Sequence, residues 1–243
     1  MKPAFYTGVS GLVAFQEKMD VIGNNIANCN TPGYKAQNTS FQQLLSTEMY
    51  TNTKNTSFSG NGVAAVNSGI DTSQGATIAS QGSLDMAISG NGWFSVESNG
   101  QKKYTRDGAF SISLLGTTAN LVNQSGAFVL DSSGNRVSAT VDSKTSAIDI
   151  DSMLKKVGVF TFANPEALSQ TSSNCYMANS YTGAAKVASK SEYTVLTGRL
   201  EQSSVSLADE MVNLISAQRA YQLSARVVQT ADEIEQTVNS LRG

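Results

Sequence analysis

Two segments with the periodicity of amphipathic helices stand at opposite ends of this 243-residue chain. In the first segment, residues 4–28, apolar side chains recur every seven residues at Phe5, Leu12, Met19 and Ile26. Other apolar residues fill the spacing at threes and fours, which predicts a helix with an a/d seam about 37 Å long. A turn rich in Asn, Thr, Pro and Gly follows and ends the helix.

The second segment begins where Ser206 and Asp209 have the spacing of a capping box. Its apolar periodicity predicts a helix over residues 207–240, roughly 50 Å long. The apolar stripe shifts slightly in phase toward the C-terminal end. Its members are Leu207, Met211, Leu214, Tyr221, Ala225, Val228, Ala231, Ile234, Val238 and Leu241.

The chain between these helices has a different character. Residues 35–85 are rich in Ser, Thr, Asn, Gln and Gly. Residues 86–200 alternate short β-type runs with Gly- and Asn-containing turns, and examples of these runs are 93–96, 109–112, 127–130 and 157–162. The sequence therefore predicts an α+β chain with a central all-β domain. The expected divisions are an N-terminal helical region 1–30, an extended segment with some β-structure 31–84, a β domain 85–200 and a C-terminal helical region 201–243.

The terminal helices pose a packing problem that limits the fold. An antiparallel, coiled-coil-like pair buries one apolar stripe of each helix but remains thin, and helices in proteins owe most of their stability to tertiary packing. The pair therefore needs the β domain or neighbouring copies of the chain as a further surface. Plain core packing is the more common use of such stripes; their terminal placement favours assembly here.

Composition removes several functional classes. The chain has no histidine and two cysteines, Cys29 and Cys175, so a catalytic triad with histidine, a histidine-ligated zinc ion and a four-cysteine metal site within one chain are all excluded. The cysteines fit no CxxC spacing; two unpaired thiols are favoured, and a disulfide stays open. A net charge of −2 with a pI near 5.2 argues against nucleic-acid binding.

Three patterns could carry chemistry, and each has a simpler interpretation. Residues 60–65 match GxGxxA without the strand before and the helix after that dinucleotide binding requires, so a loop is expected. Asp149 and Asp151 would share a face on a strand, where solvated side chains are favoured over an acid–base pair. Ser189 and Lys190 are adjacent and are assigned to a surface loop. We therefore expect no enzyme activity, cofactor or metal; a carboxylate-based hydrolase is the rival interpretation.

The N-terminal segment does not have the pattern of a cleavable signal peptide, and no run approaches the 18 apolar residues of a membrane span. We therefore expect no direct membrane insertion. An extracellular adhesive β protein, the third interpretation, would usually carry a secretion signal and donated strands.

Several blocks together resemble the bacterial flagellar rod and hook axial family. The blocks follow the family order and reach both ends of the chain. They are residues 8–12, 19–28, 30–35, 84–94, 104–110, 200–211 and 218–221, and the motif residues are Asn24, Asn25, Asn28, Thr31, Gly33 and Tyr34. The closing block 229–234 looks most like the distal-rod subunit, whereas residues 46–59 do not match the long insert of many distal-rod proteins. A proximal-rod or short hook-like paralogue therefore stays open.

The resemblance implies a structural axial subunit of the flagellar basal-body rod, which polymerises helically, transmits torque from motor to hook and lines an export channel. It implies passage through that channel without a cleaved signal. The implied partners are copies of the chain, other rod and hook subunits, and surrounding ring proteins. The expected assembly residues are Leu12, Phe15, Met19, Ile22 and Ile26 on the first helix, and Met211, Leu214, Tyr221, Val228 and Ile234 on the last.

Overall fold

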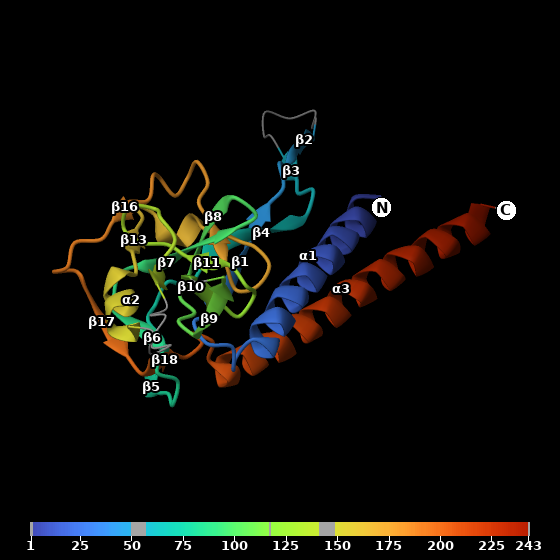
Figure 1. The fold of residues 1–243 in the computed structure, drawn as a ribbon. Helices are drawn as coiled ribbons and strands as arrows, with labels where there is room; N and C mark the ends of the chain where they lie inside the picture. Colours follow the sequence, from blue (N-terminus) through green and yellow to red (C-terminus); the bar gives the residue numbers. More distant parts are fainter. Residues whose placement is uncertain (1, 50–56, 117, 141–148, 243) are drawn as a thin grey trace. The chain divides into compact units, whose positions relative to one another are not determined.

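The computed structural model describes residues 2–49, 57–116, 118–140 and 149–242 (Figure 1). Its secondary structure begins and ends with a long helix, and the strands lie between them. The elements are α1 (Lys2–Ala27), β1 (Gln37–Gln43), β2 (Thr47–Met49), β3 (Ser57–Ser59), β4 (Val63–Ile70), β5 (Thr77–Ala79), β6 (Met86–Gly90), β7 (Trp93–Ser98), β8 (Gln101–Thr105), β9 (Phe110–Leu115), β10 (Thr118–Asn123), β11 (Phe128–Val129), β12 (Ser138–Thr140), α2 (Ile150–Lys156), β13 (Val159–Thr161), a 3₁₀ turn (Pro165–Ala167), β14 (Ser169–Gln170), β15 (Tyr176–Met177), β16 (Lys186–Val187), β17 (Tyr193–Thr197), β18 (Arg199–Glu201) and α3 (Leu207–Arg242).

The chain divides into two compact units, each assembled from segments that are distant in sequence. We call them the helical unit and the β unit. The helical unit contains Met1–Ala27, Gln37–Ser68 and Ser206–Gly243. The β unit contains Asn28–Ala36 and Gly69–Val205, and so takes in three stretches outside the expected range 85–200, namely 28–36, 69–84 and 201–205.

The helical unit confirms both predicted terminal helices. Its helices α1 and α3 are in contact, drawn in blue and red in Figure 1. Position 8 of α1 meets Val228 of α3, whereas Asn25 meets Glu210, so the helices run antiparallel. Because α3 has 36 residues and α1 has 26, the last turns of α3 extend beyond the start of α1.

Two short sheets complete the helical unit. Strand β1 pairs with β4, and β2 pairs antiparallel with β3. The ring of Phe41 on β1 lies 5.2 Å from the ring of Phe15 on α1, measured between centroids. Gly62 lies beside α1, where a Cβ atom would come within 2.0 Å of Ser10 Oγ, so only glycine fits this approach.

The β unit is built on a ten-stranded sheet with the path β12-β10-β11-β7-β8-β15-β14, to which β9, β13 and β16 add at the sides. The predicted runs at 93–96, 109–112, 127–130 and 157–162 all contribute strands to it. Its larger core contains fully buried Phe94, Val96, Leu121 and Val129. A second cluster gathers Trp93, Tyr104 and Tyr176. Burial of these side chains supplies the main driving force for folding of this unit.

The C-terminal end of the β unit returns to pair with its beginning. Strand β17 pairs antiparallel with β6, and β18 pairs antiparallel with β5, which places Glu201 opposite Thr77. Strands far apart in sequence thus close the unit, and residues 199–204 come to lie against segments near residues 33–36 and 75–79.

Helix α2 corrects one sequence expectation. Asp149 and Asp151 do not lie on a strand, because residues 150–156 form a helix with Asp149 as its N-cap. The Asp149 carboxylate accepts a hydrogen bond from the Ser152 backbone N–H over 3.2 Å, which satisfies a free helical donor. Met153 and Leu154 are the buried residues of this helix.

Candidate assembly interface

The contact between α1 and α3 relies on small side chains. Gly8 and Gly11 of α1 are buried against α3, where added Cβ atoms would lie 2.8 Å from Val228 Cγ2 and 3.1 Å from Ser224 Oγ. Ala14 and Ala217 are also buried, at 1% and 2% exposure. The two helix backbones therefore approach closely at these positions, and the large a/d residues are not the closest points of the pair.

The expected assembly residues differ in exposure. Ile22 is buried, whereas Met211 and Ile234 are each 50% exposed. Phe15 packs on Phe41 of β1. The remaining expected residues are partly buried: Leu12, Met19, Ile26, Leu214, Tyr221 and Val228. The helical unit thus leaves part of the predicted seam open to solvent.

Further large apolar side chains are exposed along both helices. On α1 these include Phe5 and Val13. On α3 they are Leu207, Met211, Val212, Ile215, Leu223, Val227, Ile234, Val238 and Leu241, which we call the exposed stripe. Both apolar core clusters lie in the β unit. An apolar surface of this extent marks an interaction site on a protein.

The motif residues after α1 form a tight turn. The Thr31 hydroxyl donates to Asn28 Oδ1 over 3.1 Å, and the Tyr34 backbone N–H donates to the Thr31 carbonyl. Gly33 has a φ of +65°, and a Cβ atom there would lie 2.4 Å from the backbone carbon of Arg106. Only glycine combines this conformation with this approach. Tyr34 is buried in the β unit, while Asn24 is exposed on α1.

Three buried charges lie beside this turn within the β unit. Glu201 Oε1 is 2.7 Å from Lys35 Nζ, and Glu201 Oε2 is 3.1 Å from a terminal nitrogen of Arg106. All three side chains are at most 3% exposed. Burial lowers the pKa of Lys35 and of Arg106, and the Glu201 carboxylate opposes that effect in both cases.

This ion cluster ties several segments together. Lys35 also donates to the Ser73 carbonyl over 2.5 Å, and Arg106 donates to the Gly90 carbonyl over 2.9 Å. The Gly75 backbone N–H donates to Glu201 Oε1. Sequence reasoning missed the cluster, although Lys35, Arg106 and Glu201 all lie inside the blocks that carry the family resemblance.

Asp107, next to the cluster, supplies a pH-dependent prediction. Burial raises the pKa of its carboxyl, against the backbone N–H of Ala109, which donates to Asp107 Oδ1 over 3.0 Å. The unfolded chain loses this proton more readily than the folded chain, so the ionised side chain destabilises the fold above its folded pKa. We expect Asp107→Asn to raise the urea midpoint at pH 7 and to leave it unchanged near pH 3, where both side chains are neutral. An equal shift at both pH values would contradict this cause.

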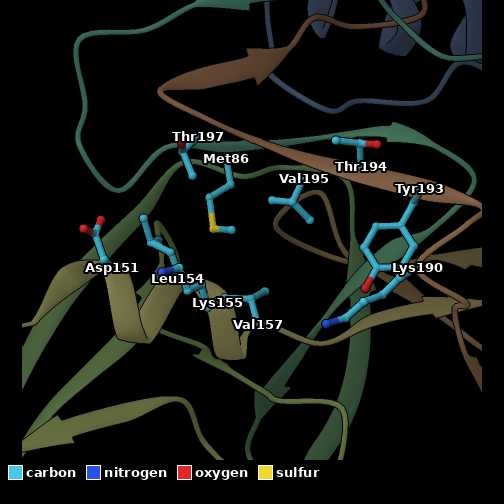
Figure 2. Close-up of a pocket in the computed structure, with 10 residues that line it drawn as sticks. All are labelled: Met86, Asp151, Leu154, Lys155, Val157, Lys190, Tyr193, Thr194, Val195 and Thr197. Carbon is cyan, nitrogen blue, oxygen red and sulfur yellow. The ribbon is translucent and has the colours of Figure 1, made fainter.

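The β unit also has an open groove, whose volume is about 570 Å³. Figure 2 shows it between α2 and β17, with Met86, Leu154 and Val195 among its apolar lining and with Asp151 and Lys190 at opposite ends. Its charged groups do not converge on one point as a hydrolytic site would require. Within the described ranges, no group of three or more Cys, Asp or Glu side chains is placed to hold a metal ion.

The other sequence patterns have structural roles. Residues 60–62 form a loop that leads into strand β4, so the GxGxxA match has no following helix. Residues 189–191 lie in a turn before β17. Cys29 and Cys175 are free thiols, and burial raises the pKa of Cys175. Of the helices in the described part of the chain, none combines the length and apolarity that a membrane crossing requires.

The chain thus combines two terminal helices that carry exposed apolar side chains with an inserted β unit. Three family models match the chain: flagella basal body rod protein over residues 5–35, the flagellar hook protein FlgE/F/G D1 domain over 87–159, and flagellar basal body rod FlgEFG protein C-terminal over 196–241. They cover the α1 region, the strands of the large sheet from β7 to β12, and the α3 region, in that order.

Similar proteins extend over the whole chain. The flagellar basal-body rod protein FlgG of Bacillus subtilis is 32% identical over 271 residues, covering 100% of both chains. The flagellar basal-body rod protein FlgF of Caulobacter vibrioides is 30% identical, over 98% of this chain and 96% of its own length. The flagellar hook-basal body complex protein FlhP of Bacillus subtilis is 29% identical over the full length of both.

This chain belongs to the flagellar basal-body rod protein family. It is a structural protein of the bacterial flagellar basal body and not an enzyme, which confirms the family and the functional class expected from the sequence.

Proposed function

We propose that this protein is an axial rod subunit that polymerises helically through α1 and α3. The exposed stripe on α3 carries the proposal, because the helical unit leaves these apolar side chains in water and packing against neighbouring copies removes them from it. A contact between different surfaces of successive copies does not close on itself, so the array grows as a helix.

The proposed pairing extends to the expected assembly residues. Leu12, Phe15, Met19, Ile22 and Ile26 form the α1 side, and Met211, Leu214, Tyr221, Val228 and Ile234 form the α3 side, in coiled-coil-like contacts within and between copies. The helices of successive copies then form a tube around the export channel, and the chain transmits torque from motor to hook. Other rod and hook subunits, and ring proteins around the rod, are the further proposed partners.

Met211→Asp tests this interface. Met211 is half exposed in the single chain, so the charge is tolerated there but becomes buried and unpaired in the polymer, which costs several kcal/mol per contact. We expect cells that carry only this variant to lack rods and to be non-motile. Ser216→Asp, an equal charge at an exposed polar position of the same helix, is the control and should support motility. Normal rods built from Met211→Asp would refute the proposed interface.

The distal rod is the proposed position, since FlgG proteins are prominent among the similar proteins and match the whole chain. A proximal-rod or short hook-like position is the second candidate, favoured by the similarity to FlgF and FlhP. Purified hook–basal bodies decide between them. Electron cryomicroscopy with an epitope tag on this chain should place the label in the distal part of the rod, and a label elsewhere would assign the second candidate.

A further inference from the structure

Asn25 is a buried polar side chain that lies between α1 and α3. It is 1% exposed. Its amide nitrogen donates to Glu210 Oε1 over 2.8 Å and to the Gln37 carbonyl over 3.0 Å, and its amide oxygen accepts from the Gln37 backbone N–H over 3.0 Å. One side chain thus joins α1, α3 and the start of β1 inside the helical unit.

The rest of the helix contact has little to fix its position lengthwise. Gly8 faces Val228 and Gly11 faces Ser224, while Ala14 and Ala217 are small. If α1 slid by one turn along α3, Gly11 would face Val228 and other small or apolar residues would still face one another. Packing alone therefore distinguishes weakly between these two alignments.

The hydrogen bonds of Asn25 strongly favour the native alignment over the shifted one. The same one-turn slide would place Asn25 opposite Leu214 and away from Glu210. Burial of an amide without hydrogen-bond partners is unfavourable, and a single buried asparagine is an established way of fixing the register of paired helices.

The polar junction continues into a small cavity beside Asn25. The cavity has a volume of about 130 Å³, and its lining is mostly polar, with Asn38, Thr39 and Asn213 beside Asn25 and Glu210, although Val21 and Ile22 also line it. Thr39 Oγ1 is buried there and makes no hydrogen bond within the described residues. Ordered water suits such a polar space. It would offer further hydrogen-bond partners to Asn25 in the native alignment, whereas Leu214 would offer none in the shifted alignment.

We propose that Asn25, paired with Glu210, sets the register of α1 on α3. The alignment that it selects determines which apolar side chains the two helices present outward. The consequence for assembly rests on the proposed function, whereas the register itself is a property of the single chain.

Cross-linking in the full-length chain tests the register. In a Cys29→Ser, Cys175→Ser background, one chain carries Gly8→Cys with Val228→Cys, the native alignment. A second carries Gly11→Cys with Val228→Cys, the alignment one turn away. Each is oxidised in trimethylamine N-oxide, which favours the compact state, and the disulfide-linked peptides are quantified by mass spectrometry. With Asn25 intact, the native pair should form at least tenfold more than the shifted pair.

Asn25→Leu should lower the ratio of native to shifted disulfide at least tenfold, since leucine fits either alignment. Asn24→Leu, the same change at an exposed position one residue earlier, is the control and should keep the ratio within twofold. A native-to-shifted ratio that stays unchanged in Asn25→Leu would overturn the proposal, as would the absence of a preference for the native pair when Asn25 is intact.

Glu210 provides a second pair of variants should Asn25→Leu prevent the helices from pairing. Glu210→Gln keeps an acceptor oxygen for the Asn25 amide and should keep the ratio within twofold. Glu210→Leu removes the acceptor and should lower the ratio; equal ratios for these two variants would overturn the proposal. The disulfide forms within a single chain, so a failed register test would contradict the proposed register but not the proposed rod interface. Conversely, normal rods built from Met211→Asp would contradict the interface but not the register.

Discussion

Glu201→Gln is expected to lower the free energy of unfolding of the β unit by about 3–5 kcal/mol, the usual loss when one partner of a buried ion pair is removed. Glutamine keeps the shape and one acceptor oxygen, but Lys35 and Arg106 then remain as two buried cations without the carboxylate that pairs with both. Urea unfolding of the full-length chain measures the loss. The single tryptophan, Trp93, reports it because it is buried in the β unit.

The matched control is Glu97→Gln. Glu97 Oε2 lies 2.8 Å from Arg136 Nε in the same unit, but the Arg136 side chain is 52% exposed. An exposed pair contributes about 0–1 kcal/mol, so the same chemical change should have little effect there. Adding Lys35→Met to Glu201→Gln should restore part of the stability, because one of the two unpaired cations is removed. Similar losses for the Glu97 and Glu201 variants would show that burial of the cluster does not matter.

Gly33→Ala is the second change with a large expected effect, a loss of about 3 kcal/mol from the β unit. The left-handed conformation at φ +65° costs an L-residue roughly 1–2 kcal/mol. The new Cβ atom would also lie 2.4 Å from the backbone nitrogen of Asp107, where no flexible side chain can move aside. The steric clash adds about 1–3 kcal/mol, and it threatens the hydrogen bond from the Gly33 N–H to the Glu201 carbonyl.

Gly100→Ala separates these two causes. Gly100 has a φ of +75°, and no atom lies within 4 Å of the position that its Cβ would take. It should therefore show only the conformational cost of about 1–2 kcal/mol. Urea unfolding followed by Trp93 fluorescence compares the two variants directly. If Gly33→Ala lost no more stability than Gly100→Ala, the close approach of the turn to the Arg106–Asp107 backbone would be unimportant.

The sequence predicts those parts of the fold that repeat locally. Heptad spacing places α1 and α3 within a few residues of their observed bounds, and turn residues separate the strands of the large sheet. Helix α2 was missed, although Asp149 as a cap followed by apolar residues at 150, 153, 154 and 157 is a readable helix signal.

The parts that the sequence did not predict depend on contacts between distant residues. Lys35 and Glu201 are 166 positions apart, and no local pattern indicates that their side chains meet. The pattern of large apolar residues likewise does not indicate Gly8 and Gly11, which matter because the absence of a side chain lets α1 approach α3 closely. The pairing of assembly residues between copies stays a prediction, because it concerns contacts with a second chain.

The segment Gly69–Val205, the larger part of the β unit, begins and ends beside residues 34–36, and near its start the Asp71 backbone N–H donates to the Ala36 carbonyl over 2.7 Å. The Ser204 backbone N–H donates to the Tyr34 carbonyl, and the Ala36 N–H donates to Ser204 Oγ over 3.0 Å. A module whose two attachment points are neighbours can be enlarged, reduced or exchanged while the flanking chain keeps its path. The body carried between residues 71 and 204 can therefore diversify in evolution, or be replaced by a foreign domain in engineering, provided that the contacts of its two ends with residues 34–36 are retained.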